Sequence, residues 1–223
     1  MKNSRLPAIV SNPKSDVRYS VIWLHGLGAS GDDFAPIVAE LGIQEELGIR
    51  FIFPHAPQIP VTINNGFVMP AWYDIYEMDL MRKADSTGIE QSRNIITEMI
   101  NDEIKAGIAA ENIVIAGFSQ GGVVALETGL RFNHPLAGIM ALSTYLPNPD
   151  DFPIAEQSAN GETSIFYGHG DFDPVIPLVQ ATTSQQFLAQ AGYQIEWHQY
   201  PMEHSVCPQE IGDIKNWLIS VLK

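Results

Sequence analysis

The chain has 223 residues, of which 45% are hydrophobic and 17% are charged, and its formal net charge is -14. A chain of this length and apolar content can bury one substantial core. Because no Pro-, Gly- or Ser-rich linker divides it, we expect a single domain over residues 1–223. The excess of acidic residues argues against nucleic acid and anionic membranes as partners, because both would be repelled.

The amino-terminal residues do not have the pattern of a secretory signal. Lys2 and Arg5 are followed by an apolar stretch that Pro7 interrupts and that ends at Ser11, which is too short for a signal peptide. No apolar run is long enough to span a bilayer. We therefore expect a cytoplasmic protein without stable membrane insertion. Its single cysteine, Cys207, cannot form an internal disulfide.

Short apolar runs alternate with helical patterns through most of the chain. The predicted strands cover residues 19–24, 50–53, 112–116, 136–142, 164–168 and 193–200, and the predicted helices cover residues 89–106, 120–132, 178–191 and 209–222. Strands of a parallel sheet are buried on both faces and are joined by helices. The alternation therefore predicts an α/β fold, in which a mostly parallel central sheet has helices on both faces.

A glycine-rich loop, His25-Gly26-Leu27-Gly28, follows the first predicted strand. The two glycines flank Leu27 and free its backbone to turn, so that the Leu27 amide can donate to an oxygen of a bound substrate. A dinucleotide-binding turn and a plain connector are the alternatives, but the glycines do not fit the G-x-G-x-x-G spacing. We expect His25 to order the loop.

A long connection, residues 55–88, separates the second predicted strand from the first predicted helix. It has roughly thirty residues, well beyond an ordinary connection, and segments of this kind commonly form a lid or a wall. Phe67, Met69, Trp72 and Tyr73 are side chains of the sort that line an acyl channel, so we expect them to contact substrate, Trp72 above all. The alternative is a segment that merely patches the core.

The pentapeptide Gly117-Phe118-Ser119-Gln120-Gly121 lies directly between an apolar run and a helical pattern. The G-x-S-x-G pattern is typical of a sharp strand-to-helix turn, which needs glycines because the two backbones come too close for side chains. The turn pushes the serine hydroxyl out into a site. The pattern predicts Ser119 as a nucleophile and the Gln120 amide as a donor to the oxyanion.

A serine hydroxyl is a weak nucleophile unless a base removes its proton, and in this architecture an acid and then a histidine follow the serine along the chain. Two late histidines, His198 and His204, fit that order best. His198 lies in a predicted half-exposed strand, where a surface residue is the simpler interpretation. His204 follows the end of that strand, where such a sheet keeps its ligand crevice, and is the predicted base.

Residues 169–174, rich in Gly, Asp and Pro, form a predicted turn after a buried strand. Asp171 and Asp173 are both candidates for the acid, and either could instead cap the turn or the next helix. We favour Asp173, because Pro174 stiffens the backbone after it and Asp171 is well placed to bind turn amides. A metal site that includes His169 is a further alternative, but no other close His or Cys completes it.

The glycine loop at 25–28, the serine turn at 117–122, the acidic turn at 169–174 and His204 occur in one order. Together they resemble the acyl-protein thioesterase and small carboxylesterase family of α/β-hydrolases, and the resemblance extends over essentially the whole chain from about Tyr19. The resemblance implies a nucleophile, an acid, a base and two oxyanion amides at Ser119, Asp173, His204, Leu27 and Gln120. Relatives commonly have another aromatic residue at the position of Tyr145, which bears on substrate preference.

These motifs predict a serine hydrolase that cleaves carboxylic ester or thioester bonds through an acyl-enzyme intermediate, without a metal or other cofactor. Its substrate would be a small acyl ester or thioester, an acylated protein or a lysophospholipid, and the protein would be a monomer or a homodimer. The alternative is a catalytically silent α/β-hydrolase that binds an acyl ligand or a partner protein. An intact set of catalytic groups favours the enzyme, because a binding module has no need to keep them together.

Overall fold

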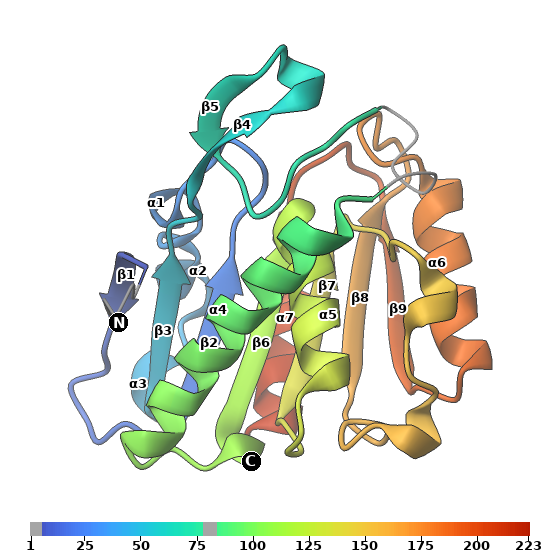
Figure 1. Ribbon diagram of the computed structural model, residues 1–223. Coiled ribbons are helices and arrows are strands. Elements are labelled where there is room, and N and C mark those ends of the chain that lie inside the picture. Colours follow the sequence, from blue (N-terminus) through green and yellow to red (C-terminus); the bar gives the residue numbers. More distant parts are fainter. Residues whose placement is uncertain (1–5, 78–83) are drawn as a thin grey trace.

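The computed structural model describes residues 6–77 and 84–223, and within them seven strands form the central sheet (Figure 1). The strands are β1 (Ala8–Ser11), β2 (Tyr19–Leu24), β3 (Ile49–Pro54), β6 (Ile113–Phe118), β7 (Gly138–Leu142), β8 (Ile165–Gly170) and β9 (Ile195–Tyr200). Their order is β1-β3-β2-β6-β7-β8-β9, and the pairs are parallel except for β1 with β3. The carboxyl ends of the parallel strands therefore meet at one edge of the sheet.

The inner parallel strands are buried on both faces, as β2 illustrates, whereas the edge strand β9 is half-exposed. Val21 and Trp23 pack into one hydrophobic core, whereas Ile22 and Leu24 pack into another. This division follows from strand geometry, since successive side chains point to opposite faces of a sheet. All four side chains are fully buried, so both faces of the sheet must be covered.

Helices supply that cover on each face. One core receives side chains from α4 (Ser86–Lys105), α5 (Gln120–Arg131) and α6 (Leu178–Gln190), and the other from α2 (Ile37–Leu41), α3 (Gln44–Leu47) and α7 (Pro208–Val221). The remaining helical turns are α1 (Gly31–Phe34), η1 (Thr62–Asn64), η2 (Ala110–Asn112), η3 (Pro149–Asp151) and η4 (Ala155–Gln157). In Figure 1, α4 and α5 lie in front of the sheet and α7 lies behind it. Over the described part of the chain, none of the helices combines the length and the apolar composition that crossing a bilayer requires.

The predicted α/β fold, with a mostly parallel sheet between two helical layers, is confirmed. Three features lie outside the prediction. They are the antiparallel edge strand β1, the short helices α1 to α3, and a hairpin of β4 (Gln58–Val61) and β5 (Phe67–Pro70) in the long connection. Each of these elements has four or five residues, too few to show a clear period in the sequence.

The turn from β6 into α5 is as tight as the G-x-S-x-G pattern implies. A Cβ atom at Gly117 would lie 2.2 Å from the Gly121 carbonyl oxygen, and a Cβ atom at Gly121 would lie 2.5 Å from the Leu24 carbonyl oxygen. The carbonyl oxygens that these Cβ atoms would meet first belong to the backbone of α5 and of β2. Backbone atoms cannot move aside as a flexible side chain can. Glycine is therefore required at both positions.

We expect Gly121→Ala to lower the free energy of unfolding by about 1–3 kcal/mol, because the methyl group would push strand and helix apart. Gly212→Ala is the matched control, because a Cβ at this α7 position would meet no atom of the described residues within 4 Å. Alanine favours a helix over glycine by up to about 1 kcal/mol, so the control is expected to gain stability. Urea unfolding measures both, and equal stabilities of the two variants would contradict the close approach.

Candidate active site

Ser119 lies at the apex of the turn between β6 and α5, at the carboxyl edge of the sheet. Its backbone angles are φ 54° and ψ -119°, which residues other than glycine rarely adopt. Hydrogen bonds impose this conformation: the Ser119 amide donates to the Leu142 carbonyl at 2.8 Å, and the Ser119 carbonyl accepts from Thr144 Oγ1 at 2.7 Å. Strain of this kind concentrates at functional sites, which points to a functional role for Ser119.

His204 and Asp173 form a hydrogen-bonded pair. His204 Nδ1 lies 2.7 Å from Asp173 Oδ2, and Asp173 Oδ1 accepts from the amides of Val175 and Ile176, each at 2.8 Å. The Phe118 ring packs against the imidazole with 4.8 Å between the ring centroids. Both carboxylate oxygens and Nδ1 are thus engaged, and Nε2 is the ring nitrogen left for proton transfer.

The surroundings of Asp173 keep its carboxyl group ionised. Burial raises the pKa of Asp173, but hydrogen bonds from His204 and from the Ile176 and Val175 amides outweigh this effect and leave the pKa below its ordinary value. A carboxylate can orient His204 and stabilise the positive charge that the imidazole gains during a reaction. Asp171, the competing candidate, is exposed on the same turn.

A second histidine, His169, is fully buried beside this pair. His169 Nε2 donates to the Ile176 carbonyl at 2.9 Å and lies 3.7 Å from Asp173 Oδ2. Desolvation lowers the pKa of His169, so the ring is neutral at neutral pH. His169 therefore fastens the turn that presents Asp173. Both oxygens of Asp173 and Nε2 of His169 are engaged in hydrogen bonds, which gives this cluster the geometry of a braced turn.

The residues of the two predicted oxyanion donors, Leu27 and Gln120, line a cavity together with Ser119. Gln120 is the first residue of α5, and amides in the first turn of a helix have no partner within the helix. The Leu27 loop is held from above, because the Gly28 amide donates to the Pro70 carbonyl, at the end of β5, at 2.8 Å.

His25 has the ordering role that the sequence predicts for it. His25 Nε2 accepts from the Ala56 amide at 3.0 Å, and Nδ1 lies 2.7 Å from the Gly26 carbonyl oxygen. Since Nε2 accepts here, Nδ1 carries the proton. Desolvation lowers the pKa of His25, which keeps the ring neutral and suited to both bonds.

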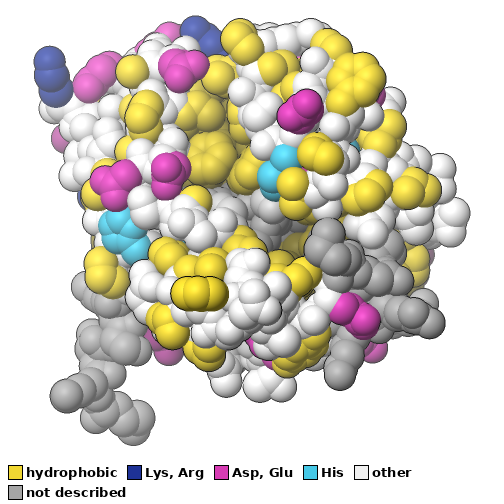
Figure 2. Space-filling model, turned by 90° about the horizontal axis from the view of Figure 1, so that it is seen from above, with side chains coloured by type: hydrophobic (Ala, Val, Ile, Leu, Met, Phe, Trp, Pro, Cys, Tyr) yellow, Lys and Arg dark blue, Asp and Glu magenta, His cyan; other side chains and the backbone are white. Residues whose placement is uncertain are grey.

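Ser119 lines two cavities at the carboxyl edge of the sheet. The wider has a volume of about 580 Å³ and is lined by Gly26, Leu27, Ala29, Asp33, Phe34, Phe118, Ser119, Val175, His204, Ser205 and Val206. The narrower has a volume of about 140 Å³ and is lined by Leu27, Ile63, Tyr73, Ile75, Ser119, Gln120, Tyr145, Val175 and Ile176. Figure 2 shows this end of the molecule from above, where hydrophobic side chains gather around hollows in the surface. A substrate can therefore extend from Ser119 in two directions.

The four predicted substrate-binding residues lie in different places. Tyr73 lines the narrower cavity, Met69 is half-buried, and Phe67 is 69% exposed on the hairpin. Trp72 is only 2% exposed, and its indole N–H donates to the His25 carbonyl at 2.8 Å. This bond and its burial make Trp72 part of the core under the Leu27 loop. We therefore revise its expected role from cavity wall to support of the loop.

Trp72→Ala is expected to destabilise the protein by about 3–5 kcal/mol, because it removes a large buried side chain. The loss of kcat/KM should be similar for acetyl and for longer acyl esters, since Trp72 acts through the loop. Thermal unfolding and a chain-length series measure the two effects. Phe67→Ala is the control and should change stability by less than about 0.5 kcal/mol, because that side chain is exposed. If the loss of kcat/KM in Trp72→Ala instead grew with the length of the acyl chain, Trp72 would be a residue of the cavity wall.

The narrower cavity also has lining residues that the sequence analysis does not predict. Ile63 and Ile75 belong to the long connection and are joined by a hydrogen bond of 2.9 Å from the Ile63 amide to the Ile75 carbonyl. Val175 and Ile176 come two and three residues after the predicted acid, Asp173. Nearness to a motif is the only signal that the sequence holds for them. Tyr145 follows β7 and is noted from the sequence only as a variable aromatic position.

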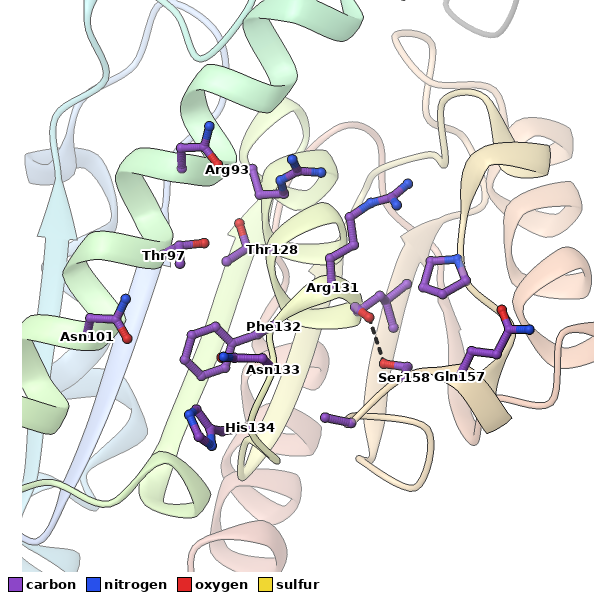
Figure 3. Close-up of a pocket in the computed structure, with 14 residues that line it drawn as sticks. Arg93, Thr97, Asn101, Thr128, Arg131, Phe132, Asn133, His134, Gln157 and Ser158 are labelled. Carbon is purple, nitrogen blue, oxygen red and sulfur yellow. Dashed lines mark hydrogen bonds between the residues drawn. The ribbon is translucent and has the colours of Figure 1, made fainter.

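A larger hollow, of about 820 Å³, lies away from Ser119, between α4, α5 and the segment before β8. Figure 3 shows the polar side chains that line it, with Arg93 and Arg131 among them. Arg131 donates to the Glu127 carboxylate at 2.8 Å and to the Asp151 carbonyl at 2.7 Å, and Arg93 lies 3.2 Å from Glu90. Both arginines are therefore already paired with groups of the protein itself. Although this hollow is larger than the cavities at Ser119, the reactive side chains lie at Ser119, and we take that place as the candidate active site.

The sheet, the strained serine turn and the acid and histidine at the carboxyl edge define an α/β-hydrolase. The chain belongs to the phospholipase/carboxylesterase family, whose model matches residues 6–222. Acyl-protein thioesterase 1 from Neurospora crassa is 41% identical over 208 residues, which cover 89% of this chain and 85% of that protein. The protein of the same name from Yarrowia lipolytica is 39% identical over 222 residues, covering 97% and 98%.

Solved structures of plant proteins have the same architecture. The crystal structure of Arabidopsis thaliana SOBER1 has a TM-score of 0.85 and 31% identity, covering 93% of this chain and 100% of that chain. Zea mays acyl-protein thioesterase 2 has a TM-score of 0.81 and 25% identity, covering 97% and 99%. The likeness therefore extends over nearly the full length of both chains.

Proposed function

We propose that this chain is a serine hydrolase of acyl esters and thioesters, with Ser119 as nucleophile, His204 as base and Asp173 as the acid that orients it. The observation that carries the proposal is the 2.7 Å contact between His204 Nδ1 and Asp173 Oδ2, in a site where a strained Ser119 and His204 line one cavity. The printed names of the fungal relatives, acyl-protein thioesterase 1, support the same class of reaction.

The proposed reaction proceeds through an acyl-enzyme. His204 Nε2 takes the proton from Ser119 Oγ as that oxygen attacks the acyl carbonyl carbon. The carbonyl oxygen becomes negative and accepts hydrogen bonds from the Leu27 and Gln120 amides. When the tetrahedral intermediate collapses, the bond to the leaving oxygen or sulfur breaks and His204 returns the proton to it. Water then attacks the Ser119 ester by the same route and releases the carboxylic acid.

The two cavities suggest how a substrate lies in the site. The leaving group must be within reach of His204, which protonates it, and His204 lines the wider cavity. The acyl chain is then left with the narrower cavity, whose walls include Ile63, Ile75 and Ile176. A wide leaving-group side suits a large alcohol or thiol, such as the glycerol part of a lysophospholipid or a cysteine of an acylated protein.

A fluorophosphonate probe tests the proposal, because it reacts with a serine that a neighbouring base activates. We expect about one equivalent of probe per chain, located on Ser119 by peptide mass spectrometry, and no labelling of Ser119→Ala. Oxygen and sulfur esters of the same acyl group would then rank the two leaving atoms. A folded protein that takes up no probe and hydrolyses neither ester would be a silent binding module instead.

A further inference from the structure

Two tyrosine hydroxyls meet in the wall of the narrower cavity. Tyr73 Oη and Tyr145 Oη lie 3.0 Å apart, and the residues are only 1% and 3% exposed. The two side chains come from different parts of the fold, since Tyr73 follows β5 in the long connection and Tyr145 follows β7. Both residues line the cavity that Ser119 also lines.

The two hydroxyl groups have one donor hydrogen more than their mutual hydrogen bond uses. Each hydroxyl supplies one donor hydrogen, and their mutual bond consumes a single one, so the accepting hydroxyl keeps its own hydrogen. Among the residues that the structure describes, neither hydroxyl has another hydrogen-bond partner. Burial raises the pKa of Tyr145 to about 12 and that of Tyr73 well above its usual value, so both remain protonated donors at neutral pH. A buried donor without an acceptor is unfavourable.

The cavity itself offers little to that hydrogen. Apart from Ser119 and the tyrosines, Gln120 is the lining residue with a polar side chain, and the others are Leu, Ile and Val. Both ends of the Gln120 amide are engaged, since Oε1 accepts from the Trp72 amide at 2.8 Å and Nε2 donates to the Tyr73 carbonyl at 2.7 Å. Once an acyl chain fills this cavity and excludes water from it, an acceptor for the spare hydrogen must come with that chain.

The volume of the cavity indicates how much of an acyl chain lies inside it. It measures about 140 Å³, which is the space of roughly five water molecules at about 30 Å³ each. A chain of about five atoms beyond the acyl carbonyl fills such a space. A charged carboxylate at this place would lose its hydration without gaining a cation, so a neutral oxygen is the fitting acceptor.

We propose that the acyl group preferred by this enzyme carries a neutral oxygen acceptor within about five atoms of its carbonyl, an ether, keto or hydroxyl oxygen, which takes the spare hydrogen bond of the Tyr73 and Tyr145 pair. This inference rests on the proposed function and names the substrate class of the same site. The tyrosines are specificity-determining residues here, because they contact the acyl chain and not the reacting carbonyl.

An oxygen scan of the acyl chain tests the inference. The substrates are the hexanoyl ester of one alcohol and its three analogues with an ether oxygen in place of methylene 3, 4 or 5. The measured quantity is the ratio of kcat/KM for each ether ester to kcat/KM for the hexanoyl ester. It is determined for the wild-type enzyme, for Tyr73→Phe, for Tyr145→Phe and for the double variant. Comparison between enzymes cancels the intrinsic reactivity of each ester.

At one oxygen position, the wild-type ratio is expected to exceed the ratio of the double variant by about three- to tenfold, the worth of one neutral hydrogen bond. At least one single variant should keep the preference, because it still has one hydroxyl with a free hydrogen. A merely structural pair would instead lower kcat/KM for all four esters alike. Equal ratios in the wild type and the double variant at all three positions would overturn the inference.

Two controls keep this result separate from other failures. If the double variant does not fold, the wild-type values are divided by the rates of hydroxide-catalysed hydrolysis of the same esters, and a maximum at one oxygen position is still expected. A flat profile after this correction counts against the inference. Failure of the proposed function itself would look different, since no ester would be hydrolysed and Ser119 would take up no fluorophosphonate.

Discussion

Ser119→Ala is expected to lower kcat for acyl esters by at least about 10⁴-fold, because it removes the atom that forms the covalent intermediate. The fold should not change. The amide of residue 119 would still donate to the Leu142 carbonyl, at 2.8 Å in the wild type, and its carbonyl would still accept from Thr144 Oγ1. Burst kinetics with a chromogenic ester, together with thermal unfolding, would measure both effects.

Ser205→Ala is the matched control for this experiment. Ser205 is the residue after His204 and lines the same wider cavity, but it is not on the strained turn. Its replacement should change kcat by less than about threefold, because its side chain is exposed and has no part in the proposed proton transfer. Turnover by Ser119→Ala at a rate near that of the wild type would end the assignment of the nucleophile.

Asp173→Asn is expected to lower kcat by about 10⁴-fold with little loss of substrate binding. The amide keeps an oxygen that can accept from the Val175 and Ile176 amides, but it offers His204 no negative charge. The imidazole would then favour the wrong tautomer, with its proton on Nε2, where it cannot accept from Ser119.

Asp171→Asn on the same turn is the control for this second variant. Asp171 is exposed, and its amide hydrogen bond to the Tyr200 carbonyl, 2.8 Å long, does not involve the side chain. We expect kcat to stay within about threefold of the wild-type value. If Asp171→Asn were the inactive variant and Asp173→Asn the active one, the role of the acid would pass to Asp171.

The low pKa of Asp173 adds a dependence of stability on pH. Its carboxyl group has a lower pKa in the folded chain than the ordinary value of 3.8, so ionisation stabilises the fold above the unfolded pKa. That contribution is lost as the pH falls through the folded pKa. The difference in unfolding free energy between the wild type and Asp173→Asn should therefore be constant from about pH 5 to about pH 8 and shrink below about pH 4.

The fold was predictable because the inner parallel strands are buried on both faces and helical segments alternate with the strands along the chain. In β2, Val21 and Trp23 face one core, and Ile22 and Leu24 face the other. Such a strand therefore appears in the sequence as a continuous apolar run. The β4 and β5 hairpin was not predictable, because Phe67 and Val68 are exposed at 69% and 64% and so follow no burial pattern. The cytoplasmic location and the monomer or homodimer state stay predictions.

The site was predictable where backbone geometry demands particular residues. Gly117 and Gly121 mark the serine turn because no other residue fits there, and the proposed acid and base, Asp173 and His204, follow in the order that is typical of α/β-hydrolases. The acyl pocket has no such constraint. Trp72 and Tyr73 are adjacent aromatic residues, yet one supports the Leu27 loop and the other lines the cavity. Only the packing of the long connection decides between these roles.

The wider cavity at Ser119 has a role after the first bond is broken. When the leaving group departs, about 580 Å³ beside His204 stand open, whereas a single water needs only about 30 Å³. An opening of this size does not select water over other small nucleophiles by shape, and His204 can take a proton from an alcohol or an amine as it does from water. Which product forms then depends on what the surrounding solution contains, so the same site that hydrolyses an ester would transfer its acyl group in a medium rich in alcohol.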